Sequence, residues 1–413
     1  MTAPRQAPAA PAPAAPVPSY ARPYAGLRVL DLSQGIAGPY CGLLLAQYGA
    51  DVVKVEPATG DWGRALGSRG GEHSPIDYTA NRGKRSIALD LKQPQGRALL
   101  GQLAARCDVF LENFRPGVVD RLGVGYAAVR AANPKVIYAS ISAFGQRGPA
   151  HELPGSDTVA QAFSGMMMVN RDAAGTPKPT GFLTADYTTA LYAFQAVAAA
   201  LAARPFEREG RFLDVSLMQA CGAMLAMKVI EERLEGGPAP KLNAPAGSYR
   251  TRDGWIAVTL TKESHFAAIC AAIGRSALAD DARFASFALR ARHLDTLAPL
   301  IQEALATRGT DAWLAVFRDA DVLASRIHDP TSWLADPQVH AMQVVDEVAV
   351  EGGVQVPWVR IPGADAPAEG DPRARWPGIG ADGAQILQDV LGLDAETIAG
   401  LAREGAWVRP ASR

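Results

Sequence analysis

The stretch Leu27–Pro57, LRVLDLSQGIAGPYCGLLLAQYGADVVKVEP, predicts the fold of the first half of the chain. "LRVLDLS" and "ADVVKVEP" are short apolar runs of the kind that form strands buried on both faces of a sheet. Between them, "GPYCGLLLAQYG" carries apolar residues at helical spacing. The stretch therefore predicts a β-α-β unit.

The same alternation continues as far as Gly145. Strand patterns recur in "RSIALDL", "DVFLENF" and "KVIYASISAFG", and they are separated by the helical patterns "PQGRALLGQLAARC" and "YAAVRAAN". Such alternation predicts an α/β fold in which helices cover both faces of a mostly parallel sheet. A sheet of this kind binds its ligands in the crevice outside the carboxyl ends of its strands.

The carboxyl edge of the predicted sheet can be located in the sequence. It comprises Ser33–Pro39, Glu56–Arg64, Leu91 and Lys92, Asn113–Arg115, and Ser142–Gly145. Basic side chains and turn backbone gather in these segments. We therefore expect this edge to bind an anionic ligand.

The length of 413 residues favours two domains. An Ala- and Pro-rich start predicts a disordered tail, and Gly and Pro break the pattern again in "LEGGPAPKLNAPAG". Beyond that break we expect an α+β domain with a hairpin turning at Asp-Gly and three amphipathic helices without intervening strands. The predicted organisation is a tail (1–24), a large domain (25–225), a linker (226–247), a small domain (248–330), and a linker with C-terminal helices returning to the large domain (331–413).

Composition excludes several classes of function. Lys and Arg (41) nearly balance Asp and Glu (42), so no global field favours nucleic acid or an anionic membrane. The longest apolar run, residues 190–203, is mostly alanine and is interrupted by Gln195, which favours a buried helix over a membrane span. The four cysteines form no CxxC or Cys/His cluster. We expect a cytoplasmic protein without a metal site, and without nucleic-acid or membrane partners.

Short motifs leave a carboxylate as the candidate catalyst. The chain has no GxxxxGK[ST], HExxH or GxSxG. "GVGYAA" from Gly123 and "GIGADG" from Gly378 resemble dinucleotide fingerprints, but neither follows a predicted strand, so turns are favoured. The six histidines are scattered. Two acids stand out by context, Asp157 in "PGSDTVAQAFSGMM" and Asp186 in "TGFLTADYTTALYAFQAVAAALAAR".

Each of these acids has a structural interpretation and a catalytic one. Asp186 stands where an alanine-rich helix begins, so it is a good helix cap. A carboxylate at a helix N-terminus is also held ionised by the backbone dipole, and it can attack a thioester carbonyl. The two roles are compatible. For Asp157, the structural interpretation is an Asx-type cap of its own helix.

The sequence blocks together resemble the class III CoA-transferases, the CaiB/BaiF group. The resemblance extends from Leu27 to about Gly405 and rests on seven blocks in order, among them "NRGKRSIALDLKQPQGRALL", "CDVFLENFRPGVVDRLGVGY", "GSDTVAQAFSGMM" and "GRFLDVSLMQA". It implies an interlocked homodimer, in which each chain has a large Rossmann-like domain and a smaller one.

The resemblance also implies a function and a set of site residues. It implies that Asp186 is the nucleophile, which forms an acyl-aspartyl anhydride and then an aspartyl-CoA thioester before a carboxylic acid acceptor takes the CoA. Asp157 is the second candidate catalytic residue. Coenzyme A enters as acyl-CoA substrate, and no tightly bound cofactor is expected. The implied CoA contacts are Ala37, Leu89, Asp90, Leu91, Lys92, Asn113, Phe114, Arg115 and Arg121.

Departures from the formyl-CoA transferase pattern bear on the substrate and on rival functions. Ile36 replaces a glutamine and Pro57 an arginine, which argues against formyl-CoA and oxalate as the substrate pair. A racemase of the same fold needs a histidine directly before the acid of the "GxD" block, and this chain has Ser156 there. A racemase or other isomerase, a non-catalytic CoA-binding subunit and an NAD-dependent oxidoreductase remain the alternatives.

Overall fold

The structure is a computed structural model that describes residues 22–67, 73–172, 174–238, 243–350, 353–368 and 370–408. The chain forms two compact units. One contains the described residues up to Leu225 and those from Asp346 onward, and the other is Ala226–Val345. The predicted tail, residues 1–24, lies outside the described residues except for its last three positions.

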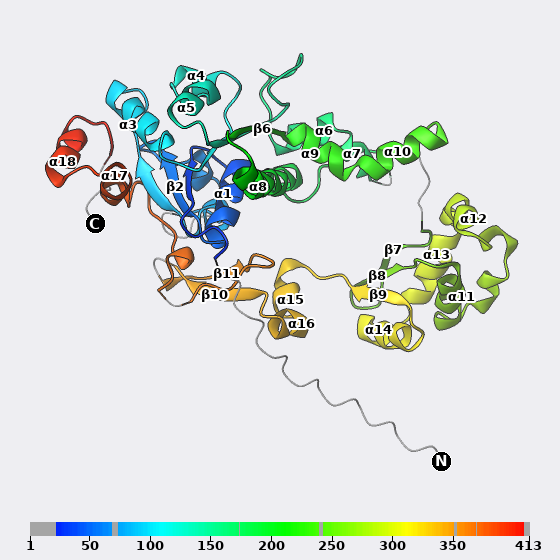
Figure 1. Ribbon diagram of the computed structural model, residues 1–413. Coiled ribbons are helices and arrows are strands. Elements are labelled where there is room, and N and C mark those ends of the chain that lie inside the picture. Colours follow the sequence, from blue (N-terminus) through cyan, green and yellow to red (C-terminus); the bar gives the residue numbers. More distant parts are fainter. Residues whose placement is uncertain are drawn as a thin grey trace. The chain divides into compact units, whose positions relative to one another are not determined.

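A six-stranded sheet forms the centre of the first unit. Its order is β3-β2-β1-β4-β5-β6 and every neighbouring pair is parallel (Figure 1), which confirms the predicted Rossmann-like α/β fold. The strand order reverses between β1 and β4, so the crevice for a ligand is expected at their carboxyl ends. The strands are β1 (Arg28–Asp31), β2 (Asp51–Glu56), β3 (Arg85–Ala88), β4 (Val109–Glu112), β5 (Ile137–Ser142) and β6 (Arg211–Ser216).

Helices cover both faces of this sheet. Because side chains alternate along a strand, consecutive residues such as Val29 and Leu30 enter two different hydrophobic cores. One core includes residues of α3, α5, α17 and α18, and the other includes residues of α1, α6, α8 and α9. The helices of this unit are α1 (Ala37–Gln47), α2 (Pro75–Ala80), α3 (Pro94–Ala104), α4 (Val118–Arg121), α5 (Tyr126–Ala132), α6 (Asp157–Phe163), α7 (Met166–Val169), α8 (Thr184–Ala203), α9 (Leu217–Met224), α17 (Gly383–Leu391) and α18 (Ala395–Arg403).

Helix α8 is the alanine-rich helix that begins next to Asp186. Its buried face consists mostly of small residues, including Ala190, Ala193 and Ala200, and it packs against α1. Small side chains let two helices approach closely, which explains why this long apolar segment is a core helix. No helix in the described part of the chain combines the length and hydropathy that crossing a bilayer requires.

The C-terminal part of the chain contributes to the first unit. Ile386 and Leu387 of α17 are buried in the same core as Ile87 of β3, and Trp407 pairs with Leu89 just after that strand. Strands β10 (Val345–Ala349) and β11 (Gln355–Val359) form a separate two-stranded sheet. The C-terminal residues therefore lie beside the strand-end edge.

The second unit is a small α+β unit built on a three-stranded antiparallel sheet. The predicted hairpin is present as β7 (Gly247–Arg250) and β8 (Trp255–Thr259). As expected, no strand separates the helices over residues 263–319, but a third strand that the sequence did not predict, β9 (Leu323–Arg326), follows them and pairs with β8. Only four residues long, β9 shows no sequence pattern of its own and is defined by its pairing. The helices are α11 (Glu263–Ala272), α12 (Phe287–Arg292), α13 (Leu294–Leu305), α14 (Thr310–Asp319), α15 (Pro330–Leu334) and α16 (Pro337–Ala341).

The segment predicted as a linker, residues 226–247, begins with a helix. Residues 226–235, AMKVIEERLE, form α10 (Ala226–Glu235), because they are good helix formers and the first helix-breaking residue is Gly236. Residues 239–242 of this segment lie outside the described residues.

Candidate active site

A cavity of about 330 Å³ lies where the strand order reverses and contains both candidate acids. Asp186 in the first turn of α8 and Asp157 at the start of α6 line it together with Leu217 at the start of α9. The loops after β1, β2, β4 and β5 supply most of the rest of its wall. The other lining residues are Gln34, Ile36, Ala37, Trp62, Asn113, Phe114, Arg115, Ile141, Ser142, Ala143, Gly155 and Ser156.

Asp157 caps α8 from a distance of 29 residues in the sequence. Its Oδ2 accepts hydrogen bonds from the backbone N–H groups of Ala185 (2.7 Å) and Asp186 (3.1 Å), while Gln161 donates to its Oδ1. The interpretation of Asp157 as a cap of its own helix is wrong, because α6 begins at this residue without a side-chain cap. The interpretation of Asp186 as a cap is also wrong, since another carboxylate takes the donors that it would bind.

The Asp186 carboxyl has an environment that favours its neutral form. Burial and the negative charge of Asp157 raise its pKa to about 7. No described residue donates a hydrogen bond to this carboxylate. The expectation that the helix dipole keeps Asp186 strongly ionised is therefore wrong, because the N-terminal donors of α8 are already occupied by Asp157. With a pKa of about 7, the ionised form of Asp186 is accessible near neutral pH, and no described residue forms an ion pair with it.

A reciprocal pair of hydrogen bonds joins the turns after β1 and β4. The backbone N–H of Gln34 donates to Asn113 Oδ1 (2.8 Å), and Asn113 Nδ2 donates to the Gln34 carbonyl (2.7 Å). The side-chain amide of Asn113, an implied CoA contact, thus holds the two strand ends together. Asn113 therefore contributes to the site by positioning these two turns.

A second cavity, of about 660 Å³, adjoins the first along the strand ends. Gln34 and Phe114 line both cavities, so the two spaces are neighbours. The second cavity extends over the ends of β2 and β3, where Leu89, Asp90, Leu91 and Lys92 line it with Pro57–Thr59. Gly405 and Val408 of the C-terminal segment complete its wall.

The basic residues of this edge differ in their placement. Lys92 lines the larger cavity and Arg115 lines the Asp186 cavity, and neither forms an ion pair with a described residue. Both are exposed, so their charges are free to meet an anion. Arg121 is exposed at the end of α4 and lines neither cavity. The structure thus brings all the implied CoA contacts except Arg121 to the two cavities.

Buried charges hold the loop that follows β2. Asp61 accepts hydrogen bonds from the backbone N–H groups of Gly35 and Gly63 and pairs with Lys54 (2.8 Å). Arg64 pairs with Glu56 (2.9 Å) and with Asp77 (2.9 Å). Gln34 and Trp62 fall within the predicted edge segments Ser33–Pro39 and Glu56–Arg64, but the sequence does not single them out as lining residues. No local pattern marks them, because their position depends on this buried network.

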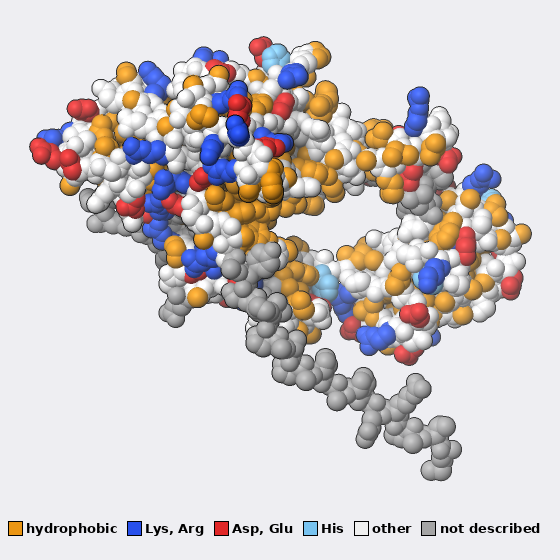
Figure 2. Space-filling view, viewed as in Figure 1, with side chains coloured by type: hydrophobic (Ala, Val, Ile, Leu, Met, Phe, Trp, Pro, Cys, Tyr) orange, Lys and Arg blue, Asp and Glu red, His pale blue; other side chains and the backbone are white. Residues whose placement is uncertain are grey.

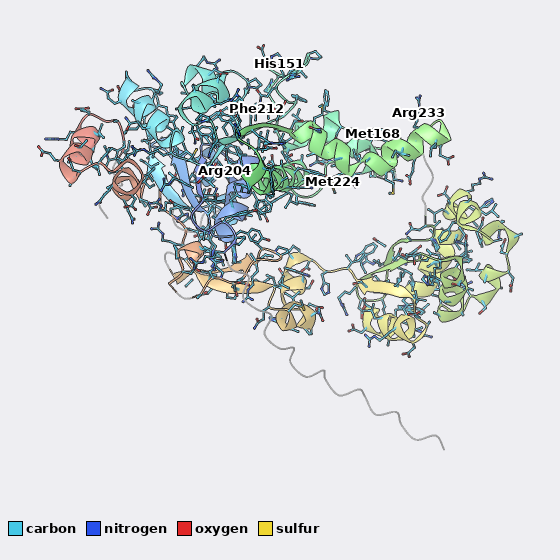
Figure 3. All side chains as sticks on the ribbon, viewed as in Figure 1. His151, Met168, Arg204, Phe212, Met224 and Arg233 are labelled. Carbon is cyan, nitrogen blue, oxygen red and sulfur yellow. The ribbon has the colours of Figure 1, made fainter. Side chains whose placement is uncertain are left out.

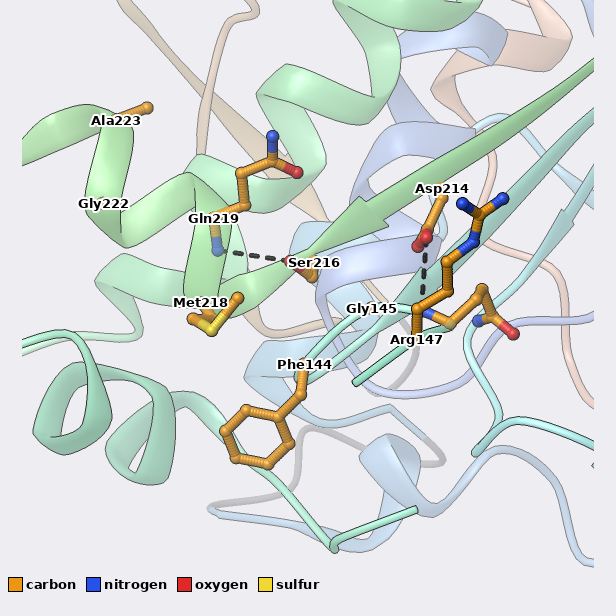
Figure 4. A pocket seen from close by; sticks show the side chains of 10 residues that line it. Phe144, Gly145, Arg147, Asp214, Ser216, Met218, Gln219, Gly222 and Ala223 are labelled. Carbon is orange, nitrogen blue, oxygen red and sulfur yellow. Dashed lines mark hydrogen bonds between the residues drawn. The ribbon is translucent and has the colours of Figure 1, made fainter. Parts of the chain in front are cut away.

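Two hollows continue the edge beyond β4. One, of about 240 Å³, is lined by Glu112, Arg115 and Gln146, and burial raises the pKa of the Glu112 carboxyl to about 7. The other, of about 650 Å³, lies at the ends of β5 and β6 (Figure 4), where Asp214 accepts from the backbone N–H of Gln146 (3.2 Å). These two hollows share only Arg115, Phe144 and Gly145 with the edge that the sequence predicts, and most of their lining residues lie outside it.

The two glycine motifs lie in turns rather than after strands. Gly123 has a left-handed backbone conformation between α4 and α5, and Gly378 lies in a loop before α17, so neither motif follows a strand. Within the described residues, no group of three or more His, Cys, Asp or Glu side chains is arranged to hold a metal ion. The chemical resources of the cavity are thus two carboxylates, a free guanidinium and polar backbone.

Comparisons with known proteins agree on one family. The sequence model of CoA-transferase family III matches residues 24–383. A succinate–glutarate CoA-transferase of Agrobacterium fabrum is 35% identical over 360 residues, which cover 84% of this chain and 90% of that protein. An acetyl-CoA:oxalate CoA-transferase of Acetobacter aceti is 33% identical over 384 residues, which cover 91% of this chain and 97% of that protein.

A solved structure gives the same result. The crystal structure of a CaiB/BaiF family protein from Brucella suis matches with a TM-score of 0.78 and 31% identity, covering 89% of this chain and 99% of that one. The comparisons confirm the resemblance found in the sequence blocks. The chain belongs to CoA-transferase family III.

Proposed function

We propose that this enzyme moves CoA from an acyl-CoA donor to a carboxylic acid acceptor, with Asp186 as the covalent nucleophile. The observation that carries the proposal is the state of the Asp186 carboxyl. It lines a cavity at the strand ends, receives no hydrogen bond from a described residue, and has a pKa raised to about 7 by burial and by Asp157. A carboxylate with little solvation and no partner is a better nucleophile than one held in an ion pair.

The proposed reaction has two symmetrical halves. A carboxylate oxygen of Asp186 attacks the thioester carbonyl of the donor, the C–S bond breaks, and CoA leaves as a thiolate from an acyl-aspartyl anhydride. The thiolate then attacks the aspartyl carbonyl, which releases the donor acid as a carboxylate and leaves an aspartyl-CoA thioester. The acceptor carboxylate attacks this thioester, the C–S bond breaks, and CoA leaves as a thiolate from a second anhydride. CoA thiolate finally attacks the acceptor carbonyl and restores the Asp186 carboxylate.

Asp157 serves in this scheme as a positioning residue. By accepting from the N–H groups of Ala185 and Asp186, it fixes the first turn of α8 and thereby the backbone that carries the nucleophile. Its negative charge is also a cause of the raised pKa of Asp186. One side chain thus sets both the position and the ionisation of the nucleophile.

The two adjoining cavities fit the two ends of an acyl-CoA. The thioester belongs in the cavity with Asp186, and the nucleotide end belongs in the larger cavity over β2 and β3. Lys92 and Arg115 are unpaired cations suited to the phosphates. The relatives act, by their names, on succinate, glutarate, oxalate and acetyl-CoA, so short acids and their thioesters are the first substrates to test.

A trapping experiment tests the covalent mechanism. Wild-type protein, Asp186→Ala and Asp157→Ala are incubated with acetyl-CoA or succinyl-CoA and hydroxylamine, and peptides are analysed by mass spectrometry. We expect a hydroxamate at Asp186 in the wild type, none in Asp186→Ala, and a slower reaction at Asp186 in Asp157→Ala. Full transferase activity in Asp186→Ala would contradict the proposal. Exchange of the α-proton of a 2-methylacyl-CoA without acyl transfer would favour the racemase.

The exposed apolar side chains support a homodimer. Helix α10 has no buried residue, and its Met227, Val229, Ile230 and Leu234 are exposed. Hydrophobic side chains also gather on the surface over α8 (Figure 2), and Met168 and Met224 are exposed in the same unit (Figure 3). A helix of ten residues with no buried side chain is marginal in water, so α10 needs a covering surface. A second copy of this chain, interlocked as the resemblance implies, is the occupant that we propose.

We propose a reducing compartment, the cytoplasm, for the protein. Cys41, Cys107, Cys221 and Cys270 are all free and buried. Burial raises the pKa of the Cys41 and Cys107 thiols, which keeps them in the unreactive thiol form. Unpaired cysteines of this kind are typical of proteins that fold without disulfides.

A further inference from the structure

Trp62 is a large aromatic residue on the wall of the Asp186 cavity that remains 52% exposed. It begins the short 3-10 helix η1 (Trp62–Ala65), in the loop between β2 and α2. Apolar side chains are usually buried, and this one instead presents its ring to the cavity and to solvent. Its position is therefore suited to contact with a ligand.

The backbone on both sides of Trp62 is fixed by buried charges. Asp61 caps η1 by accepting from Gly63 N–H (2.8 Å), and its own N–H donates to Glu56 Oε2 (2.9 Å). Two residues after Trp62, the Arg64 guanidinium donates to Glu56 (2.9 Å) and to the Pro377 carbonyl (3.2 Å). The backbone that carries Trp62 is therefore a rigid turn.

The indole ring lies directly against the turn after β1, which limits its movement in that direction. A side-chain carbon at Gly35 would be only 2.3 Å from Cζ2 of Trp62, so only a glycine leaves room for the ring. Asp61 accepts from the Gly35 N–H (2.9 Å) and thereby holds this turn to the loop that carries Trp62. The ring thus cannot move toward Gly35 to admit a larger ligand.

We propose that Trp62 is a specificity-determining residue that limits the length of the acyl group transferred. This inference rests on the proposed function, in which the acyl carbon is bound next to Asp186. Trp62 has the largest apolar side chain in a cavity of about 330 Å³; buried hydrogen bonds fix the backbone beside it, and its ring lies against Gly35. A short acyl group fits beside the ring, whereas a longer chain collides with it. The size of the side chain at position 62 would then set the length of acid that this fold accepts.

The test measures chain-length preference rather than overall rate. Wild-type protein, Trp62→Ala and Trp62→Phe each receive an equimolar mixture of acetyl-, butyryl-, hexanoyl- and octanoyl-CoA, and the acyl hydroxamates trapped by hydroxylamine are quantified by mass spectrometry. Removing the ring should raise the ratio of octanoyl to acetyl product by roughly tenfold or more, with an intermediate ratio in Trp62→Phe. Phe206→Ala, which removes an aromatic side chain 88% exposed at the far end of α8, should leave the ratio unchanged.

The outcomes separate this inference from the function on which it rests. If the wild-type protein forms hydroxamates and both Trp62 variants keep its product ratio, the specificity role is wrong while the proposed function stands. If every chain length reacts more slowly by the same factor in Trp62→Ala, the residue is merely structural and the inference is again overturned. If no thioester reacts with the wild-type protein, both proposals fail together. Trp62→Phe keeps an aromatic ring against Gly35. If Trp62→Ala does not fold, the product ratio of Trp62→Phe tests the inference.

Discussion

Asp186 combines two requirements that oppose each other. A nucleophilic carboxylate must be ionised, yet burial and the neighbouring Asp157 raise its pKa to about 7. The folded protein solvates this charge poorly, and no described residue pairs with the carboxylate, which leaves it available to react. Such a conflict is expected at a catalytic residue rather than at a structural one.

The pH dependence of acyl-enzyme formation should reflect this conflict. In the proposed mechanism only the ionised form of Asp186 attacks, so we expect the single-turnover rate to rise with pH through about 7 and to level off above it. Asp157→Asn keeps an oxygen for the N–H groups of α8 but removes the negative charge, so the midpoint should move to lower pH. Asp172→Asn, on the surface, is the control. An Asp157→Asn profile with an unchanged midpoint would contradict the electrostatic role of Asp157.

Asp186 should also destabilise the folded protein above neutral pH. Its pKa is raised from 3.8 to about 7, so between these values the native state holds a proton that the unfolded chain has released. The free energy of unfolding therefore falls as pH rises through this window. We expect Asp186→Asn to have a higher Tm than the wild type at pH 8, and the difference to shrink as pH falls toward 4. Thermal unfolding from pH 4 to 8 measures it, and an Asn variant less stable at pH 8 would contradict the raised pKa.

At the scale of elements, the site is assembled from the ends of strands and the starts of helices. Helix α8 brings Asp186 and α6 brings its partner Asp157, while the turns after β1 and β4 are joined by Gln34 and Asn113. The loop after β2 depends on Asp61, whose carboxylate binds two backbone N–H groups and Lys54. The sequence predicts each of these elements, but none of the bonds between them follows from a local pattern.

Lys54 should be essential for the stability of this edge. Its side chain is fully buried and donates to the Ser33 carbonyl (2.9 Å) besides pairing with Asp61. Lys54→Met leaves the Asp61 carboxylate buried without its cation, which should cost about 3–5 kcal/mol of unfolding free energy. Urea denaturation measures the loss. Arg211→Ala, which breaks an exposed ion pair with Glu207, is the control and should change little. Equal effects of the two substitutions would show that the buried network does not hold the loop.

At the scale of the whole molecule, the exposed apolar side chains of α10 favour association of two copies of the chain. Its apolar side chains are exposed in the single chain, with Leu234 at 80%. We expect multi-angle light scattering to give twice the mass of the chain. Leu234→Glu combined with Ile230→Glu should shift the protein toward the monomer, because a buried charge would oppose the interface. Glu235→Gln on the same helix should leave the dimer intact. A wild-type protein that is monomeric at micromolar concentration would contradict the homodimer.

The sequence by itself determined the parallel sheet, the edge at which its ligand-binding turns gather, and the acid at the start of α8. These features are local, since periodicity and the order of strand and helix patterns express them within short windows. The tertiary structure decided that Asp157 rather than Asp186 caps α8, that Asn113 binds the backbone of Gln34, and that the Trp62 ring packs against Gly35. Each of these is a contact between segments far apart in the chain, and it exists only once the sheet has brought their ends together.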